Sequence, residues 1–274
     1  TDPTFAIMAF ERAVQALSEA IAAARAERHL HGQAAGAFLG LAGVRTAGDH
    51  LAFREPLAGL GLVKQPDRIG LDHDLRIALA GGCGDQPGIV VIAGTGSAAY
   101  GRDRQAVTAQ AGGWGWLIDD QGGGTWFALQ GLRAVMEAAD GRGPRTRLEP
   151  AIFAELGVTS ARDAMLWTLR PDTARSQLAA LAPVILAAAE DGDKVAMALV
   201  TEGAHQLARM AAALDEPLDF GGGPIPVVPA GGLLSKSFYL EAFRSALAKT
   251  GHPFNLVAQP APPIAGAAFL PAEL

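Results

Sequence analysis

A chain of 274 residues with 22 basic and 28 acidic side chains carries a formal net charge of −6, which disfavours a nucleic-acid groove. Half of the residues are apolar, so the chain can bury a large core. No apolar run approaches the roughly 20 residues of a membrane span, and we expect a cytoplasmic protein that binds no membrane. The single cysteine, Cys83, excludes an internal disulfide and a cysteine-based metal site, and the spacing of the six histidines predicts no structural zinc.

Helices and strands alternate in the N-terminal part of the chain. Apolar residues at helical spacing predict a first helix over 3–27. Further elements are expected in this order: a strand at 37–43, a helix at 46–60, a strand at 68–71 and a helix from Asp74. Such an alternation predicts that the strands are parallel.

From Ile89 the pattern changes to consecutive hairpin strands. A buried run at 89–93 ends in a glycine turn, a strand follows at 98–100, and a third begins at Ala106 and is expected to run through 116–118. The remaining elements are predicted in this order: helices at 125–139, 173–190 and 193–214, a strand at 225–230, a helix at 237–249, a strand at 254–258 and a helix at 264–269. We expect Pro183 to kink the second of these helices.

Two glycine-rich segments carry the strongest chemical signal. Gly94-Thr95-Gly96-Ser97 follows the buried run, and glycines let backbone N–H groups face an anion while small hydroxyls add donors. The second segment, 112–115, contains a tryptophan and is followed by Asp120. A tryptophan and a carboxylate beside such a turn suit a polar ring such as a sugar. The residues alone therefore predict a site for phosphate and a polyol.

The first glycine segment also fits a different interpretation. With Ala99 it satisfies the G-x-G-x-x-A fingerprint of dinucleotide-binding proteins, which requires a helix to begin at the turn. Gly101 and the polar residues 102–104 arrive where that helix should continue, so the pattern favours a hairpin. A nicotinamide-dependent oxidoreductase is the second functional hypothesis, and a purely structural glycine turn is the alternative without function.

The order of these motifs resembles the BadF/BadG/BcrA/BcrD ATPase and N-acetylglucosamine kinase family of the actin-like sugar-kinase superfamily. The matching segments are AGTGS at 93–97, GGWGW at 112–116, a GDEGS-like segment around Asp120, Asp74 with the residues after it, and 228–235. The lone Cys83 favours the sugar-kinase branch, because members that activate 2-hydroxyacyl-CoA dehydratases hold an iron–sulfur cluster with more than one cysteine per chain.

The resemblance implies an α/β fold of two ribonuclease-H-like lobes around a cleft. The N-terminal lobe is expected over 1–87, with the last helix, 263–274, as a candidate to return to it, and the C-terminal lobe over 88–262. The implied activity is phosphorylation of N-acetylglucosamine or glucosamine at the 6-hydroxyl, with ATP and Mg²⁺, by a homodimer.

The resemblance also implies the roles of individual residues. Asp74 would take the proton from the attacking hydroxyl, with Asp72 as the competing base. The expected nucleotide contacts are Gly94, Thr95, Gly96, Gly231, Gly232 and Ser235. The expected sugar contacts are Ser97, Ala98, Gly113, Trp114, Gly115 and Asp120, whose carboxylate would accept hydrogen bonds from hydroxyls.

Each of these residues also has an ordinary structural interpretation. Asp74 stands at the start of a helix, where an N-cap is about as typical a role for an aspartate as that of a catalytic base. The glycines at 112–115 and 231–232 suit plain turns. Gln121 and Gly123 replace a glutamate and a serine that are usual in the family, which leaves the choice of sugar open.

The first phosphate motif of the family, a DGGGTKT-like segment after opening hairpin strands, does not occur in the N-terminal half of this sequence. We therefore expect that lobe to contain a truncated sheet of about two parallel strands, whose edge faces solvent or a second copy. This form should phosphorylate sugar poorly. A sugar-binding protein without catalysis is the third functional hypothesis.

Overall fold

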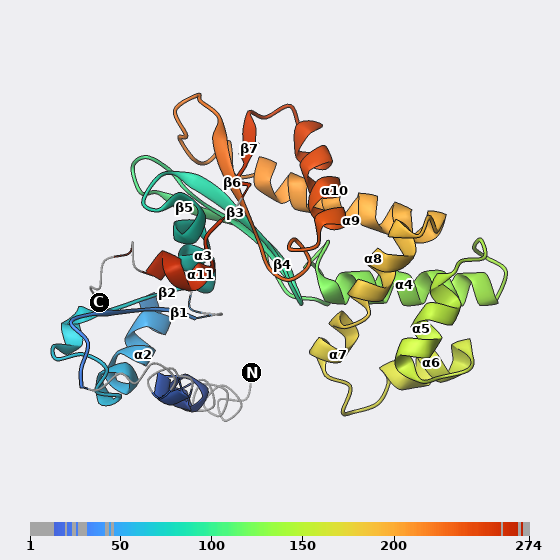
Figure 1. The fold of residues 1–274 in the computed structure, drawn as a ribbon, viewed down its shortest axis with the longest axis horizontal. Helices are drawn as coiled ribbons and strands as arrows, with labels where there is room; N and C mark the ends of the chain where they lie inside the picture. Colours follow the sequence, from blue (N-terminus) through green and yellow to red (C-terminus); the bar gives the residue numbers. More distant parts are fainter. Residues whose placement is uncertain are drawn as a thin grey trace. The chain divides into compact units, whose positions relative to one another are not determined.

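The computed structural model describes residues 14–19, 21–23, 26, 32–41, 44, 47–258, 260–267 and 270. The chain forms two compact units, one of residues 1–85 with 261–274 and one of residues 86–260. Each unit combines helices with a sheet (Figure 1), so the predicted α/β class is confirmed.

The sheet of the first unit has two parallel strands among the described residues, β1 (Ala37–Gly40) and β2 (Ile69–Asp72). These two parallel strands agree with the parallel pair that the sequence predicts for this part of the chain. Helix α2 (Ala47–Gly59) connects the strands, and its Leu57 is buried in a core with Ile69 and Leu71. Of the helix expected over 3–27, the described residues 14–19, 21–23 and 26 are helical, and the others lie outside the described residues.

Helix α3 (Asp74–Cys83) follows β2 directly and packs against α11 (Pro263–Gly266). The N–H of Ala261 donates a 3.0 Å hydrogen bond to the carbonyl of Gly81. A side chain at Gly266 would collide with the backbone of α3, so a glycine is needed where the two helices meet. The last helix thus returns to the first unit.

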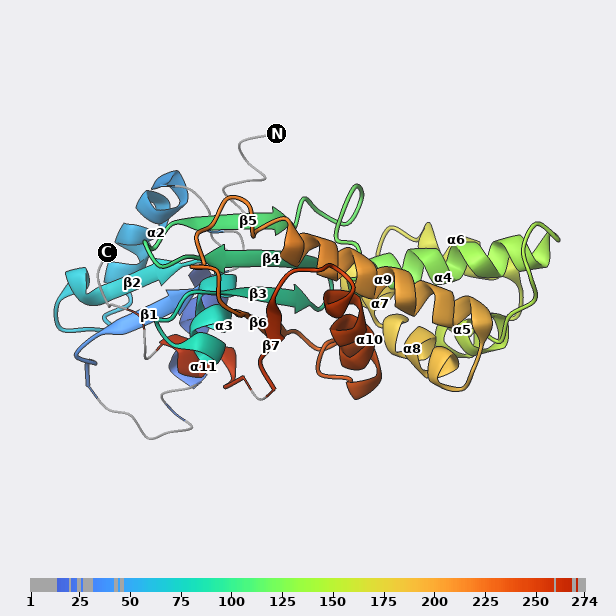
Figure 2. The ribbon, with the colours of Figure 1, turned by 90° about the horizontal axis from the view of Figure 1, so that it is seen from above.

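The second unit is built on a five-stranded sheet in the order β5-β4-β3-β6-β7. The strands are β3 (Gly88–Ala93), β4 (Ser97–Arg102), β5 (Thr108–Gly112), β6 (Ile225–Ala230) and β7 (Phe254–Leu256). The first three form an antiparallel meander, seen side by side in Figure 2, and β6 and β7 add parallel to β3. Strand β3 is almost entirely buried, which explains its continuous apolar sequence.

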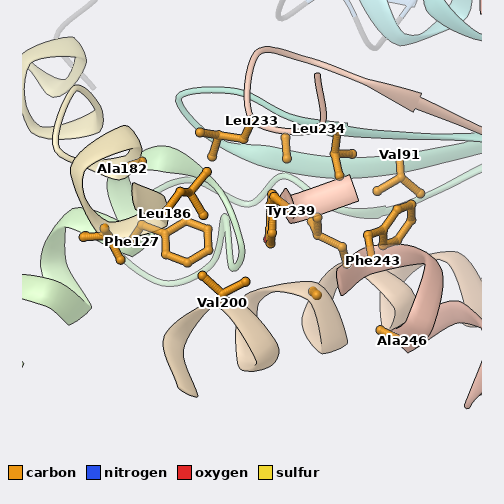
Figure 3. Close-up of a cluster of buried hydrophobic side chains, with 14 of the residues drawn as sticks. Val91, Phe127, Ala182, Leu186, Val200, Leu233, Leu234, Tyr239, Phe243 and Ala246 are labelled. Carbon is orange, nitrogen blue, oxygen red and sulfur yellow. The ribbon is translucent and has the colours of Figure 1, made fainter. Parts of the chain in front are cut away.

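Helices of the second unit bury a core shared with this sheet. They are α4 (Gly124–Ala139), α5 (Leu148–Leu156), α6 (Ala161–Thr168), α7 (Arg175–Ala179), α8 (Ala182–Glu190), α9 (Lys194–Ala212) and α10 (Ser237–Ala248). Phe127 and Tyr239 pack edge to face in this core, with ring centroids 5.2 Å apart (Figure 3). The hydroxyl of Tyr239 donates a 3.0 Å hydrogen bond to the carbonyl of Gly122, which ties the core to the loop before α4.

Two expectations about the second unit are wrong. The third hairpin strand ends at Gly112, and residues 116–118 form a turn, because Gly112, Gly113 and Gly115 adopt positive φ angles that interrupt a strand. The helix expected over 173–190 is two helices, α7 and α8. Pro183 lies in the first turn of α8, where its missing N–H is tolerated, and so it begins a helix without kinking one.

Candidate functional site

The Gly94–Ser97 segment forms a tight turn between two antiparallel strands. Ala93 and Ser97 pair across it, and the N–H of Gly94 donates a 2.9 Å hydrogen bond to the carbonyl of Gly96. The side chain of Thr95 is exposed at the tip. Because strand β4 follows the turn where a dinucleotide fingerprint requires a helix, the predicted hairpin is confirmed and the oxidoreductase hypothesis loses its structural basis.

The N-terminus of α4 packs directly on this turn. The N–H of Gly124 donates to the carbonyl of Gly94 at 2.7 Å, and both the N–H and the hydroxyl of Thr125 donate to the carbonyl of Thr95 at 3.0 Å. A Cβ atom at Gly123 would lie 2.6 Å from the carbonyl carbon of Gly96. A side chain at position 123 would therefore collide with the backbone of the glycine turn.

Asp120 lies beside the same turn in a conformation unusual for a residue with a side chain. Its φ is +56°, a left-handed conformation that costs a non-glycine residue about 1 kcal/mol or more, and the residue is 4% exposed. Its Oδ2 atom forms an ion pair with Nη2 of Arg175, the first residue of α7. Both groups lie so close to Gly96 that a side chain at this position would have to displace the ion pair.

Arg175 was not predicted as a site residue. Its Nε atom lies 3.4 Å from the hydroxyl of Thr125, so the guanidinium touches α4 as well as Asp120. No sequence motif surrounds Arg175, and it lies 55 residues from its carboxylate partner. Only the tertiary fold reveals that this cation stands over the glycine turn.

The two segments expected to bind sugar, 97–98 and 113–115, lie at one end of the β4–β5 hairpin, where β4 begins and β5 ends. Ala98 pairs with Gly112, and the hydroxyl of Ser97 donates a 2.7 Å hydrogen bond to the carbonyl of Gln121. Both Ser97 and Ala98 are buried. They therefore support the loop that carries Asp120, and the strand brings that loop beside residues 112–115.

The loop after Gly112 presents apolar side chains to solvent. Trp114 is 75% exposed, and Leu117 and Ile118 are exposed as well. A turn holds the loop, since the N–H of Asp119 donates to the carbonyl of Gly115 at 2.8 Å and the carboxylate of Asp119 accepts from the N–H of Trp114 at 3.1 Å. The backbone of Gly113 and Gly115, with positive φ, fixes this shape.

The second glycine pair lies at the end of β6, next to the end of β3. The N–H of Leu233 donates a 3.0 Å hydrogen bond to the carbonyl of Ala93, and the positive φ of Gly231 lets its backbone touch Ala93 where a side chain would collide. The hydroxyl of Ser235 donates to the carbonyl of Gly232 at 2.8 Å. The Gly94–Ser97 and Gly231–Ser235 turns thus meet at the carboxyl ends of two parallel strands, where α/β sheets commonly bind ligands.

Asp74 belongs to the first unit and opens α3. The N-cap of this helix is His73, whose Nδ1 accepts a 3.2 Å hydrogen bond from the N–H of Arg76, so the interpretation of Asp74 as an N-cap is wrong. The side chain of Asp74 is exposed and accepts from the N–H of Leu75 at 3.1 Å. The carboxylate of Asp72 is instead within ion-pair distance of Arg76, at 3.9 Å.

Within the part of the chain that the structure describes, no group of three or more histidine, cysteine, aspartate or glutamate side chains is arranged to hold a metal ion. Mg²⁺ in nucleotide enzymes needs only one or two carboxylates together with substrate phosphates, so the lack of such a group in this part of the chain does not exclude this ion. Among the described helices, none has the length and apolarity needed to cross a bilayer.

Comparisons with known sequences agree on one family. The profile of the BadF/BadG/BcrA/BcrD ATPase family matches residues 3–270. An N-acetylmuramic acid/N-acetylglucosamine kinase of Clostridium acetobutylicum is 32% identical over 210 residues, which are 76% of this chain and 68% of that protein. An N-acetyl-D-glucosamine kinase of Dictyostelium discoideum is 31% identical over 171 residues, 62% of this chain. The match to the second relative spans 53% of its length.

Solved structures share the fold. A protein from Chromobacterium violaceum described as an N-acetylglucosamine kinase superposes with a TM-score of 0.74 at 27% identity, covering 95% of this chain and 85% of that one. A glucokinase of the ROK family from Streptomyces griseus, solved with glucose and AMPPNP, gives a TM-score of 0.55 at 17% identity and covers 93% and 86% of the two chains. These likenesses confirm the two-lobed α/β fold of the actin-like sugar kinases.

Proposed function

Because the chain belongs to the BadF/BadG/BcrA/BcrD ATPase family, we propose that it is a sugar kinase that transfers the γ-phosphoryl group of ATP to the 6-hydroxyl of N-acetylglucosamine or glucosamine. The observation that carries this proposal is the junction of the Gly94–Ser97 turn with the start of α4, the Gly231–Ser235 turn and the buried carboxylate of Asp120. The kinase names of its relatives support the same class of substrate.

In this proposal the phosphates of ATP lie at the Gly94–Gly96 turn. The first two N–H groups of α4 already donate to the carbonyls of Gly94 and Thr95, so they are not free to bind the phosphates directly. The helix instead attracts the phosphates through the positive end of its dipole. Direct contacts come from the turn itself, where the hydroxyl of Thr95 is exposed. Gly231, Gly232 and Ser235, one strand away, then bind the adenosine.

The sugar lies on the other side of the turn, against Asp120. The carboxylate of Asp120 pairs with the guanidinium of Arg175, and a carboxylate binds hydroxyls more strongly than a neutral acceptor does. Gly113, Trp114 and Gly115 supply backbone groups to the sugar, and Ser97 and Ala98 support the loop beneath it. Arg175 holds the sugar-side carboxylate directly above the phosphate-side glycine, Gly96.

Asp74 acts as the base for the attacking hydroxyl. Its carboxylate is exposed, whereas that of Asp72 accepts a 2.8 Å hydrogen bond from the N–H of His73 and lies 3.9 Å from Arg76. Phosphoryl transfer needs little else from the protein beyond alignment of the two substrates and stabilisation of charge. Mg²⁺, when bound with the nucleotide, would neutralise charge on the phosphates. We further propose that the two units are ribonuclease-H-like lobes and that the protein is a homodimer, which light scattering can test.

The test is to titrate the protein separately with AMPPNP·Mg²⁺, NADH and N-acetylglucosamine by calorimetry, and then to follow ³¹P NMR of a reaction with ATP. Binding of nucleotide and sugar, together with a new signal of a sugar 6-phosphate, is the expected result. Sugar binding without nucleotide binding would favour the non-catalytic hypothesis. Binding of NADH in place of AMPPNP would overturn the kinase proposal.

A further inference from the structure

A cavity in the second unit involves none of the residues of the proposed kinase site. It has a volume of about 920 Å³ and lies between the C-terminal half of α4, residues 144–147 and the start of α9. Small-molecule sites typically measure roughly 300 to 1,000 Å³, so this space can hold an organic ligand. The first residue of α4, Gly124, contacts the glycine turn, whereas residues 130–137 of the same helix line the cavity. Helix α4 also contacts α5 and α9 (Figure 1).

Positive charge gathers around this cavity although the chain as a whole is acidic. Its lining includes four cations from three separate segments: Arg133, Arg145, Arg147 and Lys194. Arg145 and Lys194 are exposed, and neither has a carboxylate partner among the residues that the structure describes. A net charge of −6 for the whole chain makes this cluster a local reversal of sign.

The two carboxylates in the lining are engaged by other groups. Asp193 accepts hydrogen bonds from the N–H groups of Ala196 at 2.8 Å and Arg147 at 2.7 Å, and from the hydroxyl of Thr146 at 3.0 Å. Burial alone would raise the pKa of Asp193, but these hydrogen bonds outweigh it and lower the pKa. Glu137 lies 3.9 Å from Arg142, which is outside the lining and pairs more closely with Asp140, at 2.7 Å. Among the described residues, neither carboxylate forms an ion pair with a cation of the lining, so these cations remain available to a ligand.

Hydrogen bonds hold two of the guanidinium groups in place without neutralising them. Arg133 donates to the side-chain oxygen of Gln130 at 3.1 Å, and Arg147 donates to the carbonyl of Asp191 at 3.2 Å. The remaining walls are apolar, and they come from Ala134, Pro144, Pro150, Val195, Ala198 and Leu199. A ligand that satisfies both kinds of wall carries a doubly charged group on an apolar body.

We propose that this cavity binds an organic phosphate, in which a phosphate group contacts the arginines and Lys194 and an apolar group packs against Val195 and Leu199. Inorganic phosphate lacks the apolar group and binds more weakly. The proposal does not depend on the kinase activity, because none of the lining residues belongs to the proposed kinase site.

The test uses phenyl phosphate as the probe, titrated into the full chain by calorimetry in the presence of saturating AMPPNP, which occupies the proposed nucleotide site. We expect saturable binding that weakens by about 10-fold or more in the double variant Arg145→Gln/Lys194→Gln. Arg170→Gln, which removes an exposed arginine elsewhere in the same unit, is the matched control and should bind like the wild type. Circular dichroism confirms that each variant is folded.

Three outcomes would overturn the proposal. The first is the absence of saturable binding by the wild type, and the second is equal affinity of the wild type and the double variant. The third is binding of inorganic phosphate as tightly as phenyl phosphate, which would leave the apolar walls without a role. Binding of phenyl phosphate to a protein that shows no kinase activity would still support this site, so the two proposals can fail separately.

Discussion

Asp120 is the residue at which the sugar and phosphate sides of the proposed site meet. Its buried carboxylate faces the guanidinium of Arg175, and both lie against Gly96. A buried charge with a partner is stable, whereas removal of one member of the pair leaves the other poorly compensated. Asp120 can therefore act on the sugar directly and on the shape of the glycine turn through Arg175, and variants must separate the two effects.

We predict that Asp120→Ala weakens sugar binding by more than about 1 kcal/mol, because bound hydroxyls lose a charged acceptor. Nucleotide affinity should barely change, and calorimetry with each ligand alone measures both. Asp67→Ala is the matched control, since it removes an exposed carboxylate that belongs to neither the proposed sugar site nor the proposed nucleotide site. Equal loss of sugar and nucleotide in Asp120→Ala would show that the residue shapes the turn and does not bind sugar.

Asp74→Asn is expected to lower kcat by a factor of about 10² or more while sugar affinity stays nearly the same, because the amide cannot accept the proton of the hydroxyl. Steady-state kinetics and direct sugar titration provide the two measurements. Asp72→Asn serves for comparison, since its carboxylate lies near Arg76. Near-normal turnover in Asp74→Asn would remove this residue from the proposed mechanism.

The reactivity of Cys83 tests the burial of the C-terminal end of α3 without any substrate. Burial raises the pKa of its thiol to about 11, so at pH 8 the folded protein holds it almost entirely protonated. Only the thiolate reacts with iodoacetamide, and the folded chain should therefore be alkylated about 100-fold more slowly than the urea-unfolded chain. Mass spectrometry over time gives both rates. Equal rates would show that the C-terminal end of α3 is open to solvent.

At the scale of elements, the start of α4 and the glycine turn are held together by direct contacts. Three hydrogen bonds from Gly124 and Thr125 reach the turn, and Gly123 lies against the backbone of Gly96. Backbone cannot move aside as a flexible side chain can. The turn can therefore change shape only if the first turn of α4 moves with it.

Gly123→Ala should destabilise the protein by roughly 1 to 3 kcal/mol and weaken nucleotide binding, because the new methyl group forces the turn away from α4. Gly223→Ala is the control, since a Cβ there meets no atom within 4 Å. Urea denaturation and AMPPNP titration compare the two variants. If Gly123→Ala were as stable as Gly223→Ala and bound nucleotide normally, the turn and the helix would not be mechanically coupled.

Periodic and local signals account for the elements that the sequence predicts well. The apolar run of β3 and the amphipathic α4 and α9 lie within a few residues of their expected bounds. Helices α5 and α6 were missed because they are short and are separated by Gly157, whose left-handed conformation ends α5. The Gly94–Ser97 hairpin was predictable because its residues are consecutive. The extent of β5 was not, since it depends on which glycines adopt positive φ.

At the scale of the whole molecule, contacts between distant segments are what the sequence does not disclose. Arg175 reaches Asp120 across 55 residues, and the cations around the cavity come from three separate segments, of which only 145–147 supplies two. Both features follow from the way α7 and α9 pack in the second unit. Sequence motifs therefore pointed to the glycine turns, whereas the position of Arg175 and the grouping of the cavity's cations required the fold.

The division of the chain into two units leads to the last prediction. Residues 86–260 contain their own five-stranded sheet and a core with fully buried Phe127, Tyr239 and Phe243, and the first unit has a separate core around Leu57 and Ile69. Both glycine turns assigned to the nucleotide lie in residues 86–260, whereas Asp74 does not. We therefore expect residues 86–260 alone to fold cooperatively and to bind AMPPNP within about 10-fold of the full chain, without turnover.

Circular dichroism, thermal unfolding and calorimetry test the isolated unit against the full chain. The variant Gly123→Ala in both backgrounds is the control, because it should weaken nucleotide binding equally in each if the turn is the main contact. A unit that folds but no longer binds AMPPNP, while the full chain does, would assign essential nucleotide contacts to the first unit. The glycine turns would then position the phosphates without binding them on their own.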